Sequence, residues 1–568
     1  MGIVAEAGVG KSRLCFEFLE ACRAGPHAVY EASAVAHGRD VPYLPILELF
    51  RALLGITKED DDAAAREKIN DSLSEDYAQT IPTICDFVGV APSKLLEVDV
   101  GPDERQRQLV GVMSELIRSE STEKPTIILI EDLHWLDAAS EVFIEQLLNA
   151  SEASRCLFVL NFRPEFKAEW LRRSRYRQIP LMSLPQDAST RLLTGLLGED
   201  PSIGPLRALI FERTMGNPFF VEEIAQSLIE SGHLQGATGA YRLVTSIEQL
   251  AIPPTVQAVL AARIDRLQER DKRLLQLAAV IGKQFPAKLL TAVSELSGDD
   301  IDKALTTLSS GDFIYQTSIY PLTEYAFKHP LTQEVALGSQ LREKRRLTHA
   351  AVAEVIEQQD IGHLEERAAL LAHHWEEAGE PLKAAHWHAR AAEWAGRTDF
   401  GAAKHHWQHV LTLVRGAEDD RSAAEFGVAA CTQLLSLSLR MGGELDEAYV
   451  LLQEGQAMAA VLGDKRAHLN LAQAYGFALN SNGDMATYLA MSLENQQTAL
   501  EINDVIVQAN ASLFLVDALG HNGRLIESLR LADEGIANYP QNIPREQWTA
   551  GLNPQAMFSL WRGYCLAW

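Results

Sequence analysis

The 568-residue sequence predicts a multidomain protein that begins with an α/β domain on a parallel sheet and ends in an all-α repeat solenoid. Three observations support this prediction. A glycine-rich loop follows a short apolar segment at the N-terminus, two apolar runs between residues 126 and 160 have the composition of buried parallel strands, and glycine-containing turns recur every 40 residues after residue 440. A helical lid and a winged-helix-like module are expected between these parts. This length is typical of about three or four domains.

Composition and charge exclude several functional classes. The formal net charge of −26 disfavours broad binding to nucleic acids and to anionic membranes. No apolar run reaches the ~18 residues that a membrane span needs, and the N-terminus lacks the organisation of a signal peptide. The six cysteines are scattered without a C-x-x-C pair. We therefore expect reduced thiols and a cytoplasmic location.

The first element is a phosphate-binding loop at residues 5–12, with the sequence Ala-Glu-Ala-Gly-Val-Gly-Lys-Ser. Its glycines allow backbone N–H groups to turn toward phosphates, Lys11 reaches the β- and γ-phosphates, and the Ser12 hydroxyl binds Mg²⁺. The following helix would direct its N-terminus at the same anion. We therefore predict ATP and Mg²⁺ as ligands. The predicted nucleotide-binding residues of this segment are Ala5, Gly8, Val9, Gly10, Lys11, Ser12 and Arg13.

The apolar segment before the loop, Gly2-Ile3-Val4, is shorter than an ordinary strand of about five or six residues. Ala5 also replaces the usual first glycine of the motif, which removes some backbone freedom. We expect the chain to be a shortened form of a longer protein. Whether the loop still binds ATP stays open at this point.

Acidic residues follow the next apolar strand, Thr126–Ile130. Glu131 and Asp132 would lie at the carboxyl edge of the sheet, where ligands bind in open α/β folds. Glu131 is predicted to hold Mg²⁺ with Ser12, and Asp132 to orient the attacking water. A further strand, Cys156–Leu160, leads to Arg163, which is predicted to sense the γ-phosphate. Ordinary solvated acids and a surface arginine are the alternatives.

These segments resemble a known family. Residues 131–137, Glu-Asp-Leu-His-Trp-Leu-Asp, resemble the E-D-L-H-W-A-D signature of STAND-type signalling ATPases of the AAA_16 (Orc1-like) group. Residues 163–165 resemble that group's sensor segment. Residues 216–223 resemble its G-N-P-F-F-x-E-E motif, whose proline, here Pro218, packs near the adenine. Further similar segments follow in order at residues 252–257, 278–282, 327–329 and 371–375, so the resemblance extends to about residue 420.

The resemblance implies an ATP-dependent signalling switch. We expect slow hydrolysis, because a switch needs population shifts rather than fast turnover. Such ATPase and tetratricopeptide regions occur downstream of the catalytic domain in bacterial multidomain class III adenylate or guanylate cyclases, and in LuxR-type regulators. The chain departs from the family at Ala5, at Leu136 and at Pro330, where alanine is usual in the last two places. We expect neither cyclase activity nor a LuxR-type helix-turn-helix in this chain.

Sequence patterns divide the chain into five parts. A P-loop NTPase core covers residues 1–180, a helical lid 181–245, a winged-helix-like domain 246–350, a helical connector with the first repeats 351–420, and tetratricopeptide-like repeats 421–568, incomplete at the C-terminus. The winged-helix-like part should hold helices at 254–268, 271–281, 287–296 and 299–309, and strands at 313–318 and 324–328. The helix that would enter a DNA groove carries Asp299, Asp300 and Asp302, which would repel phosphates. Nucleic-acid binding is therefore not expected.

The repeat prediction rests on glycines in four segments 40 residues apart, 441–444, 481–484, 521–524 and 561–564. Each glycine fits a turn between antiparallel helices. Such a solenoid would bind a protein partner on its concave face, and nucleotide-dependent self-association is a further expectation.

Eight histidines lie within 47 residues and raise the question of a metal site: His363, His373, His374, His386, His388, His405, His406 and His409. His405 and His409 share a helix face because they are four residues apart. His406, however, replaces the glutamate that an H-E-x-x-H metalloprotease requires. Helix packing with polar tips is therefore preferred to metal binding.

The expected function is thus an ATP-dependent switch. A nucleotide-inactive repeat scaffold for protein–protein interaction is the alternative, and it rests on the short first strand and on Ala5. A transcription regulator is a third possibility, although the sequence offers no DNA-binding surface for it.

Overall fold

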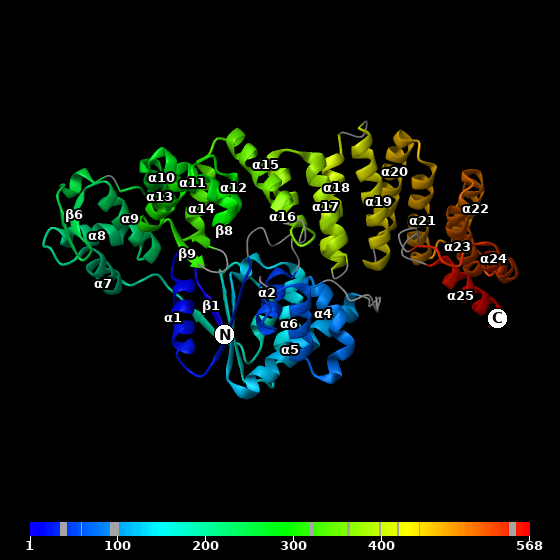
Figure 1. Ribbon diagram of the computed structural model, residues 1–568, viewed down its shortest axis with the longest axis horizontal. Helices are drawn as coiled ribbons and strands as arrows, with labels where there is room; N and C mark the ends of the chain where they lie inside the picture. The colour runs from blue at the N-terminus through cyan, green and yellow to red at the C-terminus, as the bar shows by residue number, and fades with distance from the viewer. Residues whose placement is uncertain are drawn as a thin grey trace. The chain divides into compact units, whose positions relative to one another are not determined.

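The computed structural model describes residues 1–34, 43–57, 60–90, 102–250, 252–318, 323–359, 364–396, 399–416, 420–441, 444–544 and 553–567. These residues form two compact units, residues 1–364 and residues 365–568 (Figure 1).

A five-stranded parallel sheet forms the centre of the first part of unit 1, which confirms the predicted α/β class. Its strand order is β2-β3-β4-β1-β5. The strands are β1 Gly2–Val4, β2 Ala28–Ser33, β3 Thr126–Glu131, β4 Cys156–Phe162 and β5 Gln178–Pro180. Although β1 has only three residues, it is paired on both sides, with β4 and with β5. The short first strand therefore occupies an interior position in the sheet.

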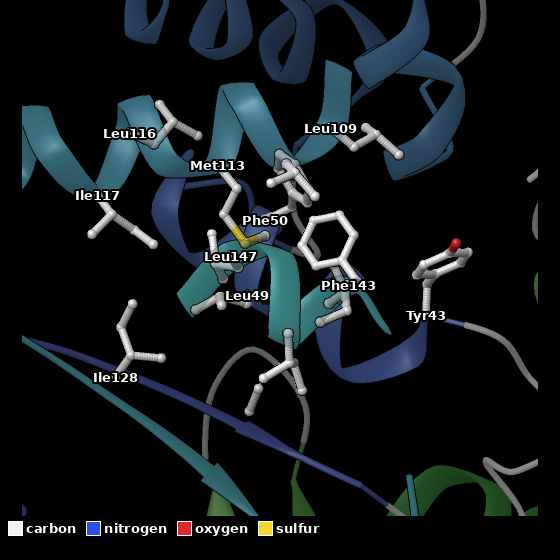
Figure 2. Packing of buried hydrophobic residues seen from close by; sticks show 14 of the residues in the cluster. Tyr43, Leu49, Phe50, Leu109, Met113, Leu116, Ile117, Ile128, Phe143 and Leu147 are labelled. Atoms are coloured by element: carbon white, nitrogen blue, oxygen red, sulfur yellow. The ribbon is translucent and has the colours of Figure 1, made fainter. Parts of the chain in front are cut away.

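Helices cover both faces of this sheet. Successive side chains of a strand point to opposite faces, so an apolar strand such as β3 presents apolar side chains on both. Ile127 and Leu129 of β3 pack in a cluster with Leu19 of α1, whereas Ile128 and Ile130 belong to a larger cluster on the other face. Figure 2 shows Ile128 in that larger cluster with residues of α2, α5 and α6. The helices are α1 Lys11–Arg23, α2 Leu44–Leu53, α3 Asp62–Ser72, α4 Ile81–Val88, α5 Pro102–Glu123 and α6 Ala138–Ala150.

Three helices and a hairpin follow the sheet. The helices are α7 Gln186–Leu197, α8 Ile203–Thr214 and α9 Pro218–Glu230, and the hairpin strands are β6 Leu234–Ala237 and β7 Ala240–Leu243. The helices were expected in this segment. The hairpin was not, since each of its strands has only four residues and Gly236 interrupts β6. The helices share one core, which includes Leu193, Ile210 and Val221.

The last part of unit 1 combines six helices with a small antiparallel sheet. The helices are α10 Val256–Arg266, α11 Glu269–Ile281, α12 Ala287–Val293, α13 Gly298–Ser310, α14 Pro330–Gly338 and α15 Arg342–Gln359. The strands are β8 Gln284–Pro286, β9 Ile314–Ser318 and β10 Glu324–Phe327, in the order β8-β10-β9. The sequence predicted four of these helices and the β9–β10 pair. It missed β8, because three residues are too few for a strand pattern.

A buried arginine connects α9 to this last part. Arg263 of α10 is only 1% exposed. Its guanidinium forms ion pairs with Glu223 and Glu230 of α9, each at 2.5 Å. It also donates a hydrogen bond of 2.6 Å to the carbonyl of Gly311, and it lies 4.5 Å from the ring centre of Phe313. One charged side chain therefore ties two segments of unit 1 together.

Unit 2 consists of consecutive α-helices, as the sequence predicts (Figure 1). They are α16 Ala368–Ala378, α17 Pro381–Ala395, α18 Phe400–Val414, α19 Arg421–Met441, α20 Leu445–Leu462, α21 Lys465–Ser481, α22 Met485–Ile502, α23 Val505–His521, α24 Leu525–Asn538 and α25 Pro554–Ala567. Gly483 and Gly523 have φ angles of 80° and 73° in the turns between helices, which confirms these two turn predictions. Gly442 and Gly443 lie outside the described residues.

The turn predicted at residues 561–564 is wrong. Gly563 lies inside α25, which continues to Ala567. The helix continues because Phe558, Trp561 and Cys565 line one face and are buried. Trp561 packs so closely on Gly520 of α23 that a Cβ atom at Gly520 would lie 2.1 Å from its ring.

Two further sequence inferences concern the chain as a whole. All six cysteines are free thiols, in agreement with the expected absence of disulfides. In the described part of the chain, no helix combines the length and the hydropathy required to cross a membrane.

Candidate functional site

The glycine-rich loop leaves β1 and enters α1. Gly8 and Gly10 have φ angles of 78° and 108°, in the left-handed region that glycine adopts without a steric penalty. No side chain caps the N-terminus of α1, and no acidic residue lies in its first turn. The first N–H groups of a helix have no partners within the helix, and an anion can supply them. The loop therefore fits a bound phosphate group.

Lys11 is held inside this loop. It is 8% exposed, and its ammonium donates hydrogen bonds to the carbonyls of Ala5 at 2.7 Å and Glu6 at 3.1 Å. Burial lowers the pKa of Lys11, and the charge of Asp132 acts in the opposite direction. The side chain predicted to reach phosphates therefore interacts electrostatically with the carboxylate predicted to orient water.

Ala5 causes no backbone strain in place of the usual glycine. It is not among the non-glycine residues with a positive φ, and it is buried at the end of β1. Its N–H donates to the carbonyl of Phe162 at 3.4 Å, which continues the pairing of β1 with β4. The conformational freedom of glycine is therefore not needed at position 5 in this structure.

Asn161 organises the two acidic residues at the end of β3. It is fully buried in β4, and its side-chain amide donates to Glu131 Oε1 at 2.7 Å. Its side-chain oxygen accepts the N–H of Asp132, also at 2.7 Å. Asp132 has a φ of 57°, a conformation that aspartate tolerates better than most residues. Asn161 was not among the residues predicted from the sequence, although a lone asparagine inside an apolar strand signals a buried polar role.

Asp132 forms an ion pair with a residue far away in the sequence. Lys283, which lies between α11 and β8, places its ammonium 2.9 Å from Asp132 Oδ2. Burial alone would raise the pKa of Asp132, but the charge of Lys283, with smaller effects of His134 and Lys11, holds the pKa of this carboxyl below its usual range. No sequence pattern pointed to Lys283.

His329 brings a second group from the last part of unit 1. Its ring stacks on Phe219 of α9, with ring centres 3.9 Å apart and planes inclined by 15°. Burial lowers the pKa of His329 to about 4, and the charges of Lys283, Arg163 and Lys11 contribute to this shift. His329 belongs to the Phe-Lys-His segment at residues 327–329, for which the sequence predicted no role.

The N-terminus of α9 contacts the loop directly. The side-chain amide of Asn217 donates to the carbonyl of Ala7 at 3.1 Å, and the N–H of Phe219 donates to the carbonyl of Gly8 at 3.2 Å. Pro218, predicted to lie near the adenine, stands between these two residues as the first residue of α9. The N-terminus of α9 and the glycine-rich loop are therefore joined by hydrogen bonds.

The remaining predicted residues differ in their surroundings. Arg163 follows β4, with its guanidinium 5.9 Å from the ring of Trp135 and 4.0 Å from Glu165. Val9 is half-buried in the loop, and Ser12 is exposed on the first turn of α1. The side chain of Arg13 is 76% exposed and pairs with Glu17 along α1. The structure thus gathers Lys11, Glu131, Asp132 and Arg163, whereas the side chain of Arg13 lies in solvent.

Comparisons with known proteins agree with this geometry. Residues 2–160 match the family model of the AAA ATPase domain, AAA_16, which confirms the resemblance for this part of the chain. The protein is 24% identical to Uncharacterized protein R02095 of Rhizobium meliloti (strain 1021) over 443 residues, which are 76% of this chain and 42% of that protein. It is 28% identical to the Hybrid signal transduction histidine kinase G of Dictyostelium discoideum over 115 residues, 20% of this chain and 3% of that protein. The chain therefore spans about two fifths of the length of the first curated relative.

Solved structures show a more distant likeness. A Signal Transduction ATPase with Numerous Domains (STAND) protein with a tetratricopeptide repeat sensor, from Pyrococcus horikoshii, aligns with a TM-score of 0.40 and 13% identity. The alignment covers 100% of this chain and 77% of that one. This likeness is too remote to define the fold of the whole chain.

Replacing Gly8 with alanine is expected to destabilise the loop. The left-handed φ alone costs about 1–3 kcal/mol for a residue with a Cβ atom. In addition, the new Cβ would lie 3.0 Å from both Asn217 Oδ1 and Phe219 Cβ. Gly10→Ala is the matched control, because Gly10 has a positive φ but no neighbouring atom within 4 Å of an added Cβ. In urea denaturation without nucleotide, Gly8→Ala should unfold at lower urea than Gly10→Ala; equal midpoints would contradict the contact between loop and α9.

Acid is expected to destabilise unit 1 through His329. A histidine with a folded-state pKa of about 4 binds fewer protons in the folded state than in the unfolded state, where the pKa is near 6.5. This part of the stability is therefore complete above pH ~6.5 and is lost as the pH falls toward 4, by up to about 3 kcal/mol. His329→Asn should flatten the dependence of the unfolding free energy on pH across this window. An unchanged dependence in the variant would contradict this assignment.

Proposed function

We propose that this protein is an ATP-binding molecular switch that hydrolyses ATP slowly. The observation that carries the proposal is that charged and titratable side chains from two parts of unit 1 converge at the carboxyl edge of the sheet. Lys11, Asp132 and Arg163 from the α/β part interact there electrostatically with Lys283 and His329 from the last part of unit 1. The match of residues 2–160 to the AAA ATPase domain supports the same function.

Each residue has a defined role in this proposal. Lys11 and the first N–H groups of α1 hold the phosphates, with Gly8, Val9 and Gly10 forming the turn around them. Ser12 and Glu131 hold Mg²⁺, which when bound neutralises phosphate charge. Asp132 orients the attacking water, Arg163 contacts the γ-phosphate, and Pro218 lies beside the base.

The ion pair between Lys283 and Asp132 gives the switch a physical basis. A carboxylate that holds an ammonium at 2.9 Å has less capacity to accept a hydrogen bond from water. We propose that Asp132 acts in hydrolysis once this ion pair opens, which requires Lys283 to move. A nucleotide that binds one arrangement more tightly than the other shifts the population between them. Residues 181–245 would serve as a lid, and residues 246–350 as a winged-helix-like clamp that transmits the nucleotide state.

The helices of unit 2 provide the output in this proposal. We assign residues 351–420 to a connector with the first repeats and residues 421–568 to tetratricopeptide-like repeats, which bind a protein partner and support nucleotide-dependent self-association. The resemblance to cyclase-linked and LuxR-linked ATPases supports a role within a cyclase-type or regulator-type protein. Asp299, Asp300 and Asp302 lie on α13, so a DNA-binding role has no support from charge.

The scaffold alternative is less well supported. This alternative assumed that the short first strand and Ala5 make the loop unable to bind nucleotide. Pairing of β1 on both sides and the unstrained conformation of Ala5 remove both reasons.

Titration with a fluorescent ATP analogue and Mg²⁺ tests the proposed function. We expect saturable binding, followed by slow release of inorganic phosphate from ATP. A well-folded protein without saturable binding would contradict the proposal and would favour the scaffold.

A further inference from the structure

Three neighbouring helices of unit 2 bring three potential metal ligands together. Glu376 lies on α16, His388 on α17 and His409 on α18. Glu376 Oε2 is 3.2 Å from His388 Nε2 and 3.7 Å from His409 Nδ1. All three ligand atoms lie within 4.8 Å of one another. The predicted packing role of these histidines does not explain why their nitrogens converge on one carboxylate oxygen.

The two distances from Glu376 Oε2 are close to those between ligand atoms in a tetrahedral metal site. Zinc bonds of 2.0–2.2 Å to nitrogen and oxygen place neighbouring ligand atoms about 3.3–3.6 Å apart. Small side-chain rotations would therefore suffice to enclose an ion. Two imidazole nitrogens and one carboxylate oxygen form a donor set that suits zinc and similar transition-metal ions, whereas Mg²⁺ and Ca²⁺ prefer oxygen ligands only.

A fourth residue orients the buried ligand. His388 is 4% exposed, and its Nδ1 lies 2.9 Å from Nδ1 of His406, which is also buried. Two ring nitrogens at this distance share one proton. If His388 donates this proton and its Nε2 carries none, Nε2 presents a lone pair to Glu376, an arrangement that a bound cation would stabilise. Metal-binding histidines are usually oriented by such a hydrogen bond from the second nitrogen.

The opposite tautomer of His388 leads to the alternative, a cluster without a metal ion. If His406 donates to His388, then His388 Nε2 carries a proton and donates it to Glu376. The same three residues then form a hydrogen-bonded cluster that has no need of an ion. The two tautomers predict different responses to added zinc.

We propose that Glu376, His388 and His409 form a binding site for a divalent transition-metal ion of the zinc class, which links α16, α17 and α18 and leaves one coordination position for water. His406 acts as a positioning residue for His388. The site lies in unit 2, whereas the proposed nucleotide site lies in unit 1.

Calorimetric titration of Zn²⁺ into the full chain tests this proposal. The protein is first stripped with EDTA and dialysed, and excess Mg²⁺ is present without nucleotide. Glu376→Gln and His409→Gln each remove one ligand; both side chains are partly exposed, at 42% and 37%, so these replacements should leave the helices folded. The matched controls are Glu377→Gln, one residue along α16, and His468→Gln, an exposed histidine of α21.

We expect one zinc equivalent to bind to the wild type and to both controls. The Kd should rise at least about 100-fold in Glu376→Gln and His409→Gln, because even partners outside the coordination shell affect metal affinity by 10- to 100-fold. Absence of saturable binding, or equal affinity in all variants, would overturn the proposal and favour the hydrogen-bonded tautomer. Co²⁺ offers a second readout with the wild type alone. Intense visible absorption of a tetrahedral ion supports the site, and only the weak absorption of hydrated Co²⁺ contradicts it.

Discussion

Lys11→Ala is expected to lower the affinity for Mg²⁺-ATP about 10- to 100-fold. A hydrogen bond between charged groups contributes about 1.5–3 kcal/mol, and 1.4 kcal/mol corresponds to a tenfold change in Kd. Lys11 is buried and already held at the loop by the carbonyls of Ala5 and Glu6, so it is positioned in advance for the phosphates. Alanine would remove the only side-chain cation that the loop itself supplies among residues 5–12.

The measurement is a titration of the fluorescent ATP analogue into the wild type and the variant, both checked by circular dichroism. Lys465→Ala serves as the control, because Lys465 is an exposed residue of unit 2 whose ion pair with Glu501 is at the surface. The control should bind like the wild type. If Lys11→Ala also binds like the wild type, the nucleotide does not lie in this loop.

Arg263→Ala is expected to destabilise unit 1 by about 3–5 kcal/mol, the usual effect of removing one partner of a buried ion pair. Glu223 would be left buried without its partner, and the contacts with Glu230, Gly311 and Phe313 would be lost as well. Burial raises the pKa of Glu223 even now, and the charge of Arg263 limits that rise. The variant should also weaken ATP binding, because α9 carries the residues that contact the loop.

Urea denaturation measures this effect. Arg273→Ala is the matched control, since Arg273 forms an exposed ion pair with Glu269 one turn away on α11. Exposed pairs of this type contribute about 0.3–0.5 kcal/mol. A loss in Arg263→Ala no larger than in this control would show that the buried ion pairs do not hold the two segments together.

The sequence predicted the parts of the site that are local in the chain. The loop at residues 5–12 is contiguous, and Glu131 and Asp132 follow a strand that is apolar along its length, so motif and composition were sufficient. Asn161 was missed because its role depends on the register between β3 and β4. Lys283 was missed because its partner Asp132 is 151 residues away, a pairing that only the tertiary fold reveals.

In unit 2, too, the sequence predicted some features and missed others. Gly483 and Gly523 lie in turns, as their spacing predicts. The same period predicted a turn at Gly563. This prediction is wrong, because packing of Trp561 against α23 favours a continuous helix. Among the histidines, the i, i+4 pair on α18 was visible in the sequence. The cluster of Glu376, His388 and His409 draws on three helices, so no spacing along the chain could have identified it.

Hydrogen exchange of the full chain, with and without saturating Mg²⁺-ATP, tests the switch most directly. The amides to follow are those of the loop and of β8, which lies next to Lys283, with Lys11→Ala as the control. Bound ATP is expected to slow exchange in the loop and to speed exchange in β8, because the ion pair between Lys283 and Asp132 must open. Bound ATP that leaves the exchange of β8 unchanged would contradict the coupling on which the proposed switch depends.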